Sequence, residues 1–140
     1  MYNQKSERPL GLMDFVKSAK SVIREVNAEQ LKAKLDAGED MLLVDVRESS
    51  EHEQGHIRGA MLVPRGILEA AADPGYPKNV PDLVNARNRQ VVLYCATGGR
   101  SAMGAAVLQM MGFTNVVSLA GGYGGWEQAG MPVVKEARYV

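Results

Sequence analysis

The fold of this chain is decided by the stretch Val91-Val92-Leu93-Tyr94-Cys95-Ala96-Thr97-Gly98-Gly99-Arg100-Ser101. Its first four residues are apolar and β-prone, which predicts a buried strand. A glycine-rich loop follows, and the small and apolar residues 102–111 then predict a helix that Gly112 closes. The single cysteine of the protein therefore stands where a strand gives way to a loop and a helix.

Cys95 lies at a position that favours the reactive form of a thiol. Successive backbone N–H groups of a tight loop, followed by a helix N-terminus, form an anion-binding concavity. A thiol in such a field has a lowered pKa, and the thiolate is the nucleophilic form of cysteine. We therefore expect Cys95 to be the catalytic nucleophile.

The rest of the chain alternates strands and helices. Residues 41–44 and 116–119 are apolar runs of the same character as residues 91–94, and residues 23–26 predict a further short strand. Between these runs lie helical segments; one of them starts at Asn27, which forms a capping-box pattern with Gln30. This alternation predicts an α/β domain with a parallel sheet.

Two motifs follow the ends of predicted strands. Asp45-Val46-Arg47 comes directly after residues 41–44, and Cys95 comes directly after residues 91–94. Sites in open α/β sheets lie beyond the carboxyl ends of the strands. We therefore expect the two motifs to share one rim of the sheet.

Composition sets limits on the class of protein. The 140 residues suit a single domain, and sixteen basic residues balance sixteen acidic ones, so no nucleic-acid partner is expected. No apolar run of about 18 residues is present, so no membrane span is expected. The sequence shows no secretory signal, and a lone cysteine cannot form an intramolecular disulfide. These features favour a cytoplasmic location.

An N-terminal helix is predicted from Leu12 onward. Apolar residues recur there at helical spacing, at Leu12, Phe15, Val16, Ala19, Val22 and Ile23. Such a helix packs either on the domain or on a dimer partner, so both a monomer and a homodimer remain open. A basic amphipathic helix on a membrane surface is disfavoured, because only three cations, Lys17, Lys20 and Arg24, support it.

The number of residues between the cysteine and the arginine of the loop distinguishes sulfur transfer from phosphatase chemistry. Four residues lie between Cys95 and Arg100, whereas the phosphate loop of a protein tyrosine phosphatase has five between its cysteine and arginine. A shorter loop makes a tighter anion pocket, which suits the terminal sulfur of a persulfide. Phosphatase or arsenate reductase chemistry is therefore disfavoured.

The order of several motifs resembles a rhodanese domain. The first half is carried by Asp45-Val46-Arg47-Glu48, Gly55-His56-Ile57-Arg58-Gly59-Ala60 and Val63-Pro64-Arg65-Gly66. The second half is carried by residues 94–101, Gly112-Phe113, Leu119-Ala120-Gly121-Gly122 and residues 126–133. The resemblance implies a rhodanese-like domain over residues 23–140, with residues 1–22 as an extension that carries the additional N-terminal helix.

The resemblance also implies an architecture and an activity. The fold would be a five-stranded parallel sheet with helices on both faces. Single-domain members move sulfane sulfur from a small donor such as thiosulfate to cyanide or a thiol, through a persulfide on the cysteine corresponding to Cys95. No metal or organic cofactor is expected. The alternative is a persulfide carrier or redox-sensing module that delivers sulfur to a protein partner.

The substrate-binding residues would surround Cys95. The backbone N–H groups of the loop would stabilise the anionic sulfur, and they belong to Ala96, Thr97, Gly98, Gly99 and Arg100. The Arg100 side chain would pair either with a carboxylate that fixes the loop or with the leaving sulfite. The hydroxyl of Thr97 would donate to the sulfite oxygens.

For the remaining charged and polar residues, a functional role is weighed against a structural one. Arg47 and Arg65 would lie near the pocket mouth and attract an anionic donor, although Arg47 could equally brace a loop together with Asp45. His52 and His56 are assigned structural roles, because a persulfide needs no general base. One cysteine and two histidines lack the spacing of a closed zinc site, so no metal ligand is expected.

Overall fold

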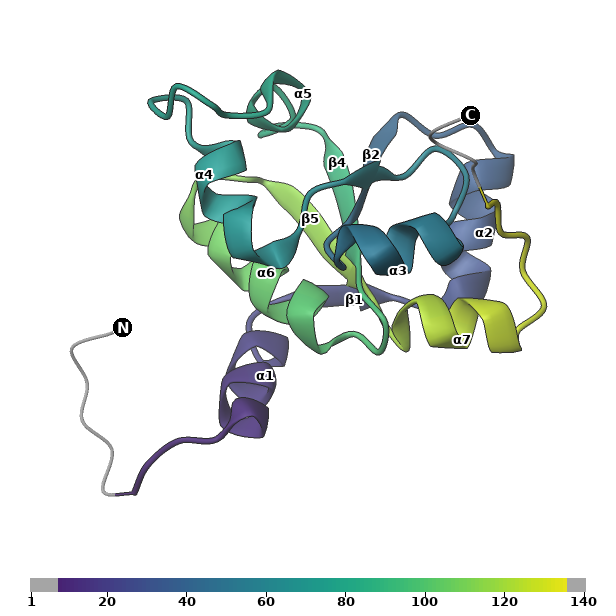
Figure 1. Ribbon diagram of the computed structural model, residues 1–140, viewed down its shortest axis with the longest axis horizontal. Coiled ribbons are helices and arrows are strands. Elements are labelled where there is room, and N and C mark those ends of the chain that lie inside the picture. Colours follow the sequence, from purple (N-terminus) through teal and green to yellow (C-terminus); the bar gives the residue numbers. More distant parts are fainter. Residues whose placement is uncertain (1–7, 136–140) are drawn as a thin grey trace.

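The computed structural model describes residues 8–135 (Figure 1). Among these residues, one sheet contains five parallel strands in the order β1-β5-β4-β2-β3. The strands are β1 (Arg24–Val26), β2 (Met41–Asp45), β3 (Met61–Leu62), β4 (Gln90–Tyr94) and β5 (Asn115–Leu119). The structure confirms the predicted α/β class and the five-stranded parallel sheet.

Helices cover both faces of the sheet. They are α1 (Leu12–Lys20), α2 (Ala28–Asp36), α3 (Ser49–Gln54), α4 (Leu68–Ala72), α5 (Pro81–Val84), α6 (Gly99–Met110) and α7 (Gly122–Gln128), with a 3₁₀ turn η1 (Arg65–Ile67) before α4. Helices α4, α5 and α6 lie on one face, and α2 and α7 lie on the other (Figure 1). This arrangement confirms the prediction of helices on both faces.

The central strand β4 shows why its sequence is apolar throughout. Val91, Leu93 and Cys95 belong to the hydrophobic core under α4, α5 and α6, whereas Val92 and Tyr94 belong to the core under α2 and α7. Side chains alternate between the faces of a strand, so a strand covered on both faces has no position for a solvated residue. Cys95 directly follows the strand and still packs in the first of these cores.

A local sequence signal fixes the start of α2. The Asn27 side chain accepts a hydrogen bond from the Gln30 amide at 2.8 Å, and the Gln30 side chain accepts one from the Asn27 amide at 2.8 Å. This reciprocal pair satisfies two N–H groups that a helix start otherwise leaves open. The capping box predicted from the sequence is therefore confirmed.

The predicted N-terminal helix is α1, and it packs on α6. Val16 and Ala19 are its buried residues. None of the helices in residues 8–135 is long and apolar enough to cross a membrane. The predicted extension (residues 1–22) and the predicted domain (residues 23–140) both reach beyond the described part, because residues 1–7 and 136–140 lie outside it. The boundary between them at residue 22 stays a prediction.

Candidate active site

Cys95 lies at the carboxyl end of β4, directly before the loop that leads into α6. Gly98 caps α6 with φ +107°, a conformation that glycine adopts at little cost. The turn aims backbone N–H groups back at the cysteine: Sγ accepts hydrogen bonds from the Gly98 amide at 3.1 Å and from the Ser101 amide at 3.4 Å. The sulfur therefore sits in an amide cradle at the N-terminus of a twelve-residue helix.

The surroundings of Cys95 favour its thiolate. Burial of the thiol alone would raise its pKa, because a charged sulfur loses its water. Hydrogen bonds from the Ser101 hydroxyl and amide, and from the Gly98 and Thr97 amides, act in the opposite direction. Together they outweigh burial and hold the pKa of Cys95 below its usual range. These contacts favour the thiolate of Cys95, which is the nucleophilic form of cysteine.

A second buried hydroxyl supports Ser101. The Ser101 Oγ atom lies 3.5 Å from the Cys95 sulfur and 2.8 Å from Ser118 Oγ, which projects from β5. Both serines are fully buried. Because Ser101 Oγ can accept a hydrogen bond from the Ser118 hydroxyl while its own hydroxyl donates one to the sulfur, the three residues form a hydrogen-bonded chain toward Cys95.

Arg100 is held by a carboxylate of α3. Its Nη1 and Nη2 atoms donate to Glu51 Oε1 at 2.9 Å and to Oε2 at 3.0 Å. The same contacts, set against a smaller effect of burial, lower the pKa of Glu51 to about 2. This geometry matches the alternative in which Arg100 pairs with a carboxylate and fixes the loop.

Helix α7 holds the loop from the other side. The Tyr123 amide donates to the Cys95 carbonyl at 2.7 Å, and the Gly124 amide donates to the Ala96 carbonyl at 3.0 Å. Gly122 makes this approach feasible, because a Cβ there would lie 2.5 Å from the Cys95 carbonyl oxygen. The start of α7 therefore fixes the backbone on which the sulfur sits.

Arg47 is buried in a network rather than displayed at the surface. Its guanidinium pairs with Asp45 at 2.8 Å and donates to the Gly55 carbonyl at 2.7 Å, with its Cζ atom 4.2 Å from the centre of the Tyr123 ring. His52 Nδ1 donates to Asp45 at 2.8 Å. Only 4% of Arg47 is exposed, so its guanidinium is committed to the protein.

The histidines and Arg65 take other positions. The rings of His52 and His56 are buried and stacked 3.7 Å apart, in keeping with the structural roles assigned to them. Arg65 donates from Nη1 to Glu69 at 2.7 Å and lines a cavity between α1 and α6. Residues 8–135 contain no group of three or more His, Cys, Asp or Glu side chains that could hold a metal ion.

Comparison with known proteins identifies the family. The model of the rhodanese-like domain matches residues 27–129 of the chain, from the start of α2 to the end of α7. The chain belongs to the rhodanese-like family. A sulfurtransferase from Allochromatium vinosum is 34% identical to this rhodanese-like chain over 113 residues, which cover 81% of the chain and 96% of that relative.

Two further proteins extend the comparison. YrkF from Bacillus subtilis, named as a candidate sulfur carrier, is 32% identical over 76% of the chain, which spans 52% of its length. A solved structure from Rhodopseudomonas palustris has a TM-score of 0.85 and 32% identity, and covers 94% of this chain and 99% of its own. That protein is described as of unknown function and as a possible tyrosine phosphatase.

The structure locates the residues expected at a rhodanese-like site. Thr97 and Gly98 direct their amides at the sulfur, Arg100 pairs with Glu51, and the side chain of Thr97 is exposed at the loop tip. The carbonyl of Ala96 accepts a hydrogen bond from α7. Gly99 is the first residue of α6, and a Cβ there would lie 3.4 Å from the Val16 side chain of α1. The structure thus brings the loop residues together at Cys95, with Arg47 buried beside Asp45.

Four functional residues were not predicted from the sequence. Ser101 contacts the sulfur and Ser118 contacts Ser101, while Glu51 holds Arg100 and Gly122 lets α7 approach the loop. Of these four residues, only Ser118 stands out in the sequence. It is the one polar residue within the apolar run 116–119.

Proposed function

We propose that this protein is a sulfurtransferase that carries sulfane sulfur on Cys95, taking it from thiosulfate or a related donor and passing it to cyanide or a thiol. One observation carries the proposal: a lone thiol with a lowered pKa lies in an amide cradle at a helix N-terminus. The relatives named for sulfur transfer support it.

The first half-reaction loads the cysteine. The Cys95 thiolate attacks the outer sulfur of thiosulfate and forms a new S–S bond. The bond between that sulfur and the sulfonate sulfur breaks, and sulfite leaves with the bonding electron pair. One anionic persulfide and one sulfite dianion result from one thiolate and one thiosulfate dianion, so charge and atoms balance.

The second half-reaction removes the transferred sulfur from Cys95. Cyanide or a thiolate attacks the terminal sulfur of the persulfide, and the electron pair of the breaking S–S bond returns to Cys95. The amides of Thr97, Gly98 and Ser101 would stabilise negative charge on sulfur in both half-reactions, because they are oriented before substrate arrives. No proton transfer is required at either step, which leaves no role for His52 or His56 as a base.

Phosphatase chemistry has weaker support. The R. palustris protein is described as a possible tyrosine phosphatase, but here only four residues separate Cys95 from Arg100. Both terminal nitrogens of Arg100 also donate to Glu51. A phosphate would need the same two nitrogens for a bidentate contact with the guanidinium. We therefore expect no turnover of an aryl phosphate.

A persulfide carrier is the second candidate function. It is supported by the likeness to YrkF and by the burial of Cys95, of which only 1% is exposed. A carrier would accept one sulfur per chain and release it only to a matching protein partner. An enzyme would instead turn over with small acceptors.

Steady-state kinetics separate these functions. Purified protein is mixed with thiosulfate and cyanide, and thiocyanate formation is followed, with Cys95→Ser as the control and an aryl phosphate in a parallel reaction. Ping-pong kinetics that Cys95→Ser abolishes support the enzyme. One equivalent of sulfur loaded without turnover indicates the carrier, and turnover of the aryl phosphate alone contradicts both.

A further inference from the structure

The first turn of α6 carries amides that bind the Cys95 sulfur. Sγ accepts hydrogen bonds from the amide of Gly98, which caps α6, and from the amide of Ser101, which lies in the first turn of the helix. A hydrogen bond weakens steeply when its donor turns away from the acceptor. The contacts that fix the first turn of α6 therefore also fix the site.

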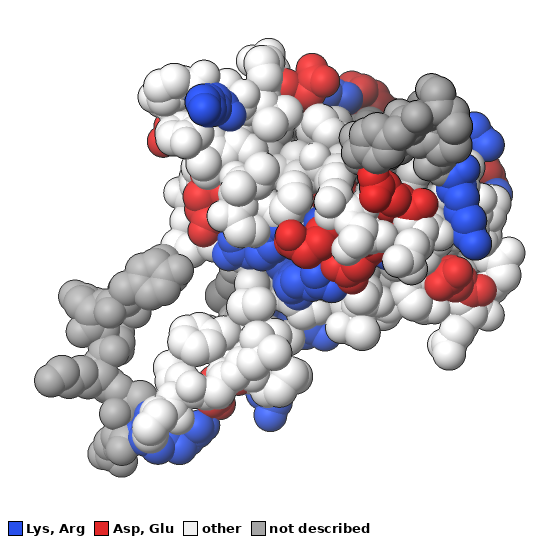
Figure 2. Space-filling view, viewed as in Figure 1, with Lys and Arg blue, Asp and Glu red and all other residues white. Residues whose placement is uncertain are grey.

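Two of these contacts come from within the residues that the family model matches. Arg100 pairs with Glu51 of α3, a helix over which acidic and basic side chains lie next to one another (Figure 2). The start of α7 holds the backbone of Cys95 and Ala96 through its amides. Neither contact involves Gly99, the first residue of α6.

A third contact comes from α1, which lies outside the matched residues 27–129. A Cβ built at Gly99 would lie 3.4 Å from Cγ2 of Val16. Apart from α6 itself and the chain neighbours of Gly99, no other heavy atom of the described residues lies within 4 Å of that position. The Val16 side chain is therefore what covers the first turn of α6 at Gly99.

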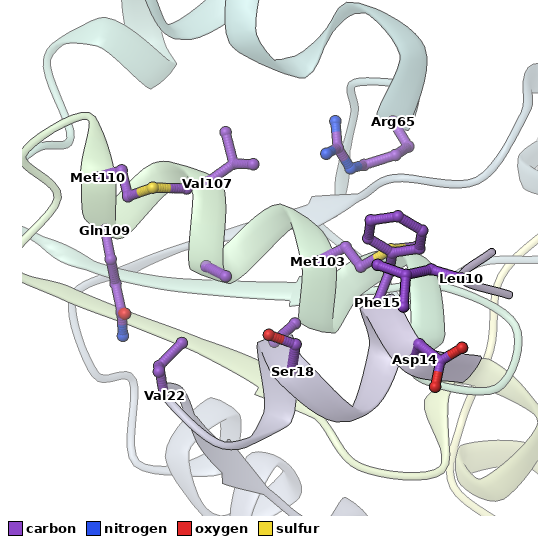
Figure 3. A pocket seen from close by; sticks show the side chains of 12 residues that line it. Leu10, Asp14, Phe15, Ser18, Val22, Arg65, Met103, Val107, Gln109 and Met110 are labelled. Carbon is purple, nitrogen blue, oxygen red and sulfur yellow. The ribbon is translucent and has the colours of Figure 1, made fainter. Parts of the chain in front are cut away.

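The direction of α1 brings its first half to this turn. Figure 3 shows α1 and α6 side by side and running the same way, with Phe15 beside Met103 toward the start of both helices. A groove of about 530 Å³ lies between their outer side chains, and Val16 is not among the residues that line it. Since only 4% of Val16 is exposed, its side chain packs into the contact between the helices instead.

Both ends of α1 are fixed. At its start, an Asp14 carboxylate oxygen accepts a hydrogen bond from the Gly11 amide at 2.7 Å, and the same carboxylate pairs with Arg8. At its end, residues 21–23 join α1 directly to β1, which pairs with β5 in the sheet. A helix held at both ends keeps its buried side chains in place against its neighbour.

We propose that Val16 is a positioning residue, which holds the first turn of α6 in its orientation toward Cys95. Truncation of Val16 to alanine removes the methyl groups that face Gly99 and leaves space into which the turn can move. The amides then lose their alignment with the sulfur, and the thiolate loses stabilisation. The consequence for sulfur transfer rests on the proposed function, whereas the consequence for the thiol does not.

Titration of the thiolate in the full chain tests this proposal. Ultraviolet absorbance follows Cys95, the only cysteine of the chain, with Cys95→Ala in each background as the blank. In Val16→Ala the thiolate should form at a higher pH than in the wild type. The kcat for sulfur transfer from thiosulfate to cyanide should fall about fivefold, because the donors are no longer held in place.

Val116→Ala is the matched control, because it makes the same truncation at another buried valine. Val116 lies beside Val91 of β4, which is about 13 Å along the chain from Cys95 and at the other end of the strand. This variant should unfold more easily than the wild type in urea but titrate like it. Circular dichroism checks that both variants are folded.

The proposal is overturned if Val16→Ala titrates like the wild type. It is also overturned if Val16→Ala and Val116→Ala shift the titration equally, since that result would show a general effect of lost stability. A shift confined to Val16→Ala supports the positioning role even if no variant transfers sulfur. That last combination would count against the proposed function alone.

Discussion

Arg100 and Glu51 form a two-pronged ion pair that joins the loop after β4 to helix α3, with N–O distances of 2.9 and 3.0 Å. The pair links residues 49 positions apart in the sequence. It commits the arginine of the loop to holding the loop in shape. In the proposed chemistry, backbone amides and Ser101 therefore stabilise the anionic sulfur.

Breaking this pair should loosen the loop. In Glu51→Gln we expect about tenfold slower sulfur transfer, because the amide cradle loses its fixed geometry. The loss of stability should be only about 1 kcal/mol at neutral pH, because both side chains are a third exposed and solvent screens the pair. Asp36→Asn, which breaks the surface pair of Asp36 with Lys32, is the control and should leave transfer unchanged.

The same pair predicts a pH dependence of stability. The pKa of Glu51 is lowered from 4.5 to about 2 in the folded protein. A depressed folded-state pKa stabilises the fold above the unfolded-state pKa, and that stabilisation disappears as the pH falls through the folded one. The difference in unfolding free energy between wild type and Glu51→Gln should therefore shrink between pH 4.5 and pH 2. A constant difference over this range would show that Glu51 does not act through its charge.

Ser101 should control the ionisation of Cys95. In Ser101→Ala the thiolate loses a hydroxyl donor, and we expect the pKa of Cys95 to rise, because a hydrogen bond that stabilises the charged form is removed. Ultraviolet absorbance of the thiolate, titrated against Cys95→Ala as a blank, measures the shift. Ser118→Ala removes only the partner of Ser101 and should give a smaller shift. An unchanged pKa in Ser101→Ala would exclude this role.

Gly122 should be intolerant of any side chain. Its φ is +60°, and an added Cβ would lie 2.5 to 2.6 Å from backbone atoms of Cys95 and Ala96. We expect Gly122→Ala to cost about 3 kcal/mol and to distort the cradle. Gly130→Ala is a matched control with φ +74° and open space, and it should cost about 1 kcal/mol. Urea denaturation measures the stability loss of each variant. Equal losses would mean that the close approach of α7 to the Cys95 loop is unimportant.

Arg47 should matter for stability more than for substrate binding. Arg47→Lys keeps the charge but loses the planar contacts with Asp45 and Tyr123, and we expect a loss of about 3 kcal/mol. The KM for thiosulfate should change less than twofold, which corresponds to a change of less than about 0.4 kcal/mol in binding free energy. If the variant unfolds like the wild type but its KM rises tenfold, Arg47 binds the donor instead.

The sequence was sufficient for the architecture because the architecture depends on local patterns. Apolar runs bounded by turn signals predicted β2, β4 and β5, and the Asn27–Gln30 pair predicted the start of α2. Position after a strand also predicted that Cys95 would face an anion-binding loop. Each of these inferences used residues close together in the chain.

The remaining features of the site depend on residues that are distant in sequence. Ser118 reaches Ser101 only because β5 lies beside β4, and Glu51 reaches Arg100 only because α3 lies over the loop. The resemblance left Arg47 either at the pocket mouth or bracing a loop together with Asp45, and its contacts with Asp45 and the Gly55 carbonyl turn it into the protein. Such pairings follow from tertiary packing, which spacing along the chain does not reveal.

The most direct test of the proposed chemistry is the mass of the protein after incubation with thiosulfate. The wild-type chain should gain one sulfur atom, about 32 mass units, on Cys95, and cyanide should remove it. Cys95→Ala should gain nothing. A wild-type protein that gains no sulfur, or a Cys95→Ala protein that gains as much, would contradict the claim that Cys95 carries the transferred sulfur.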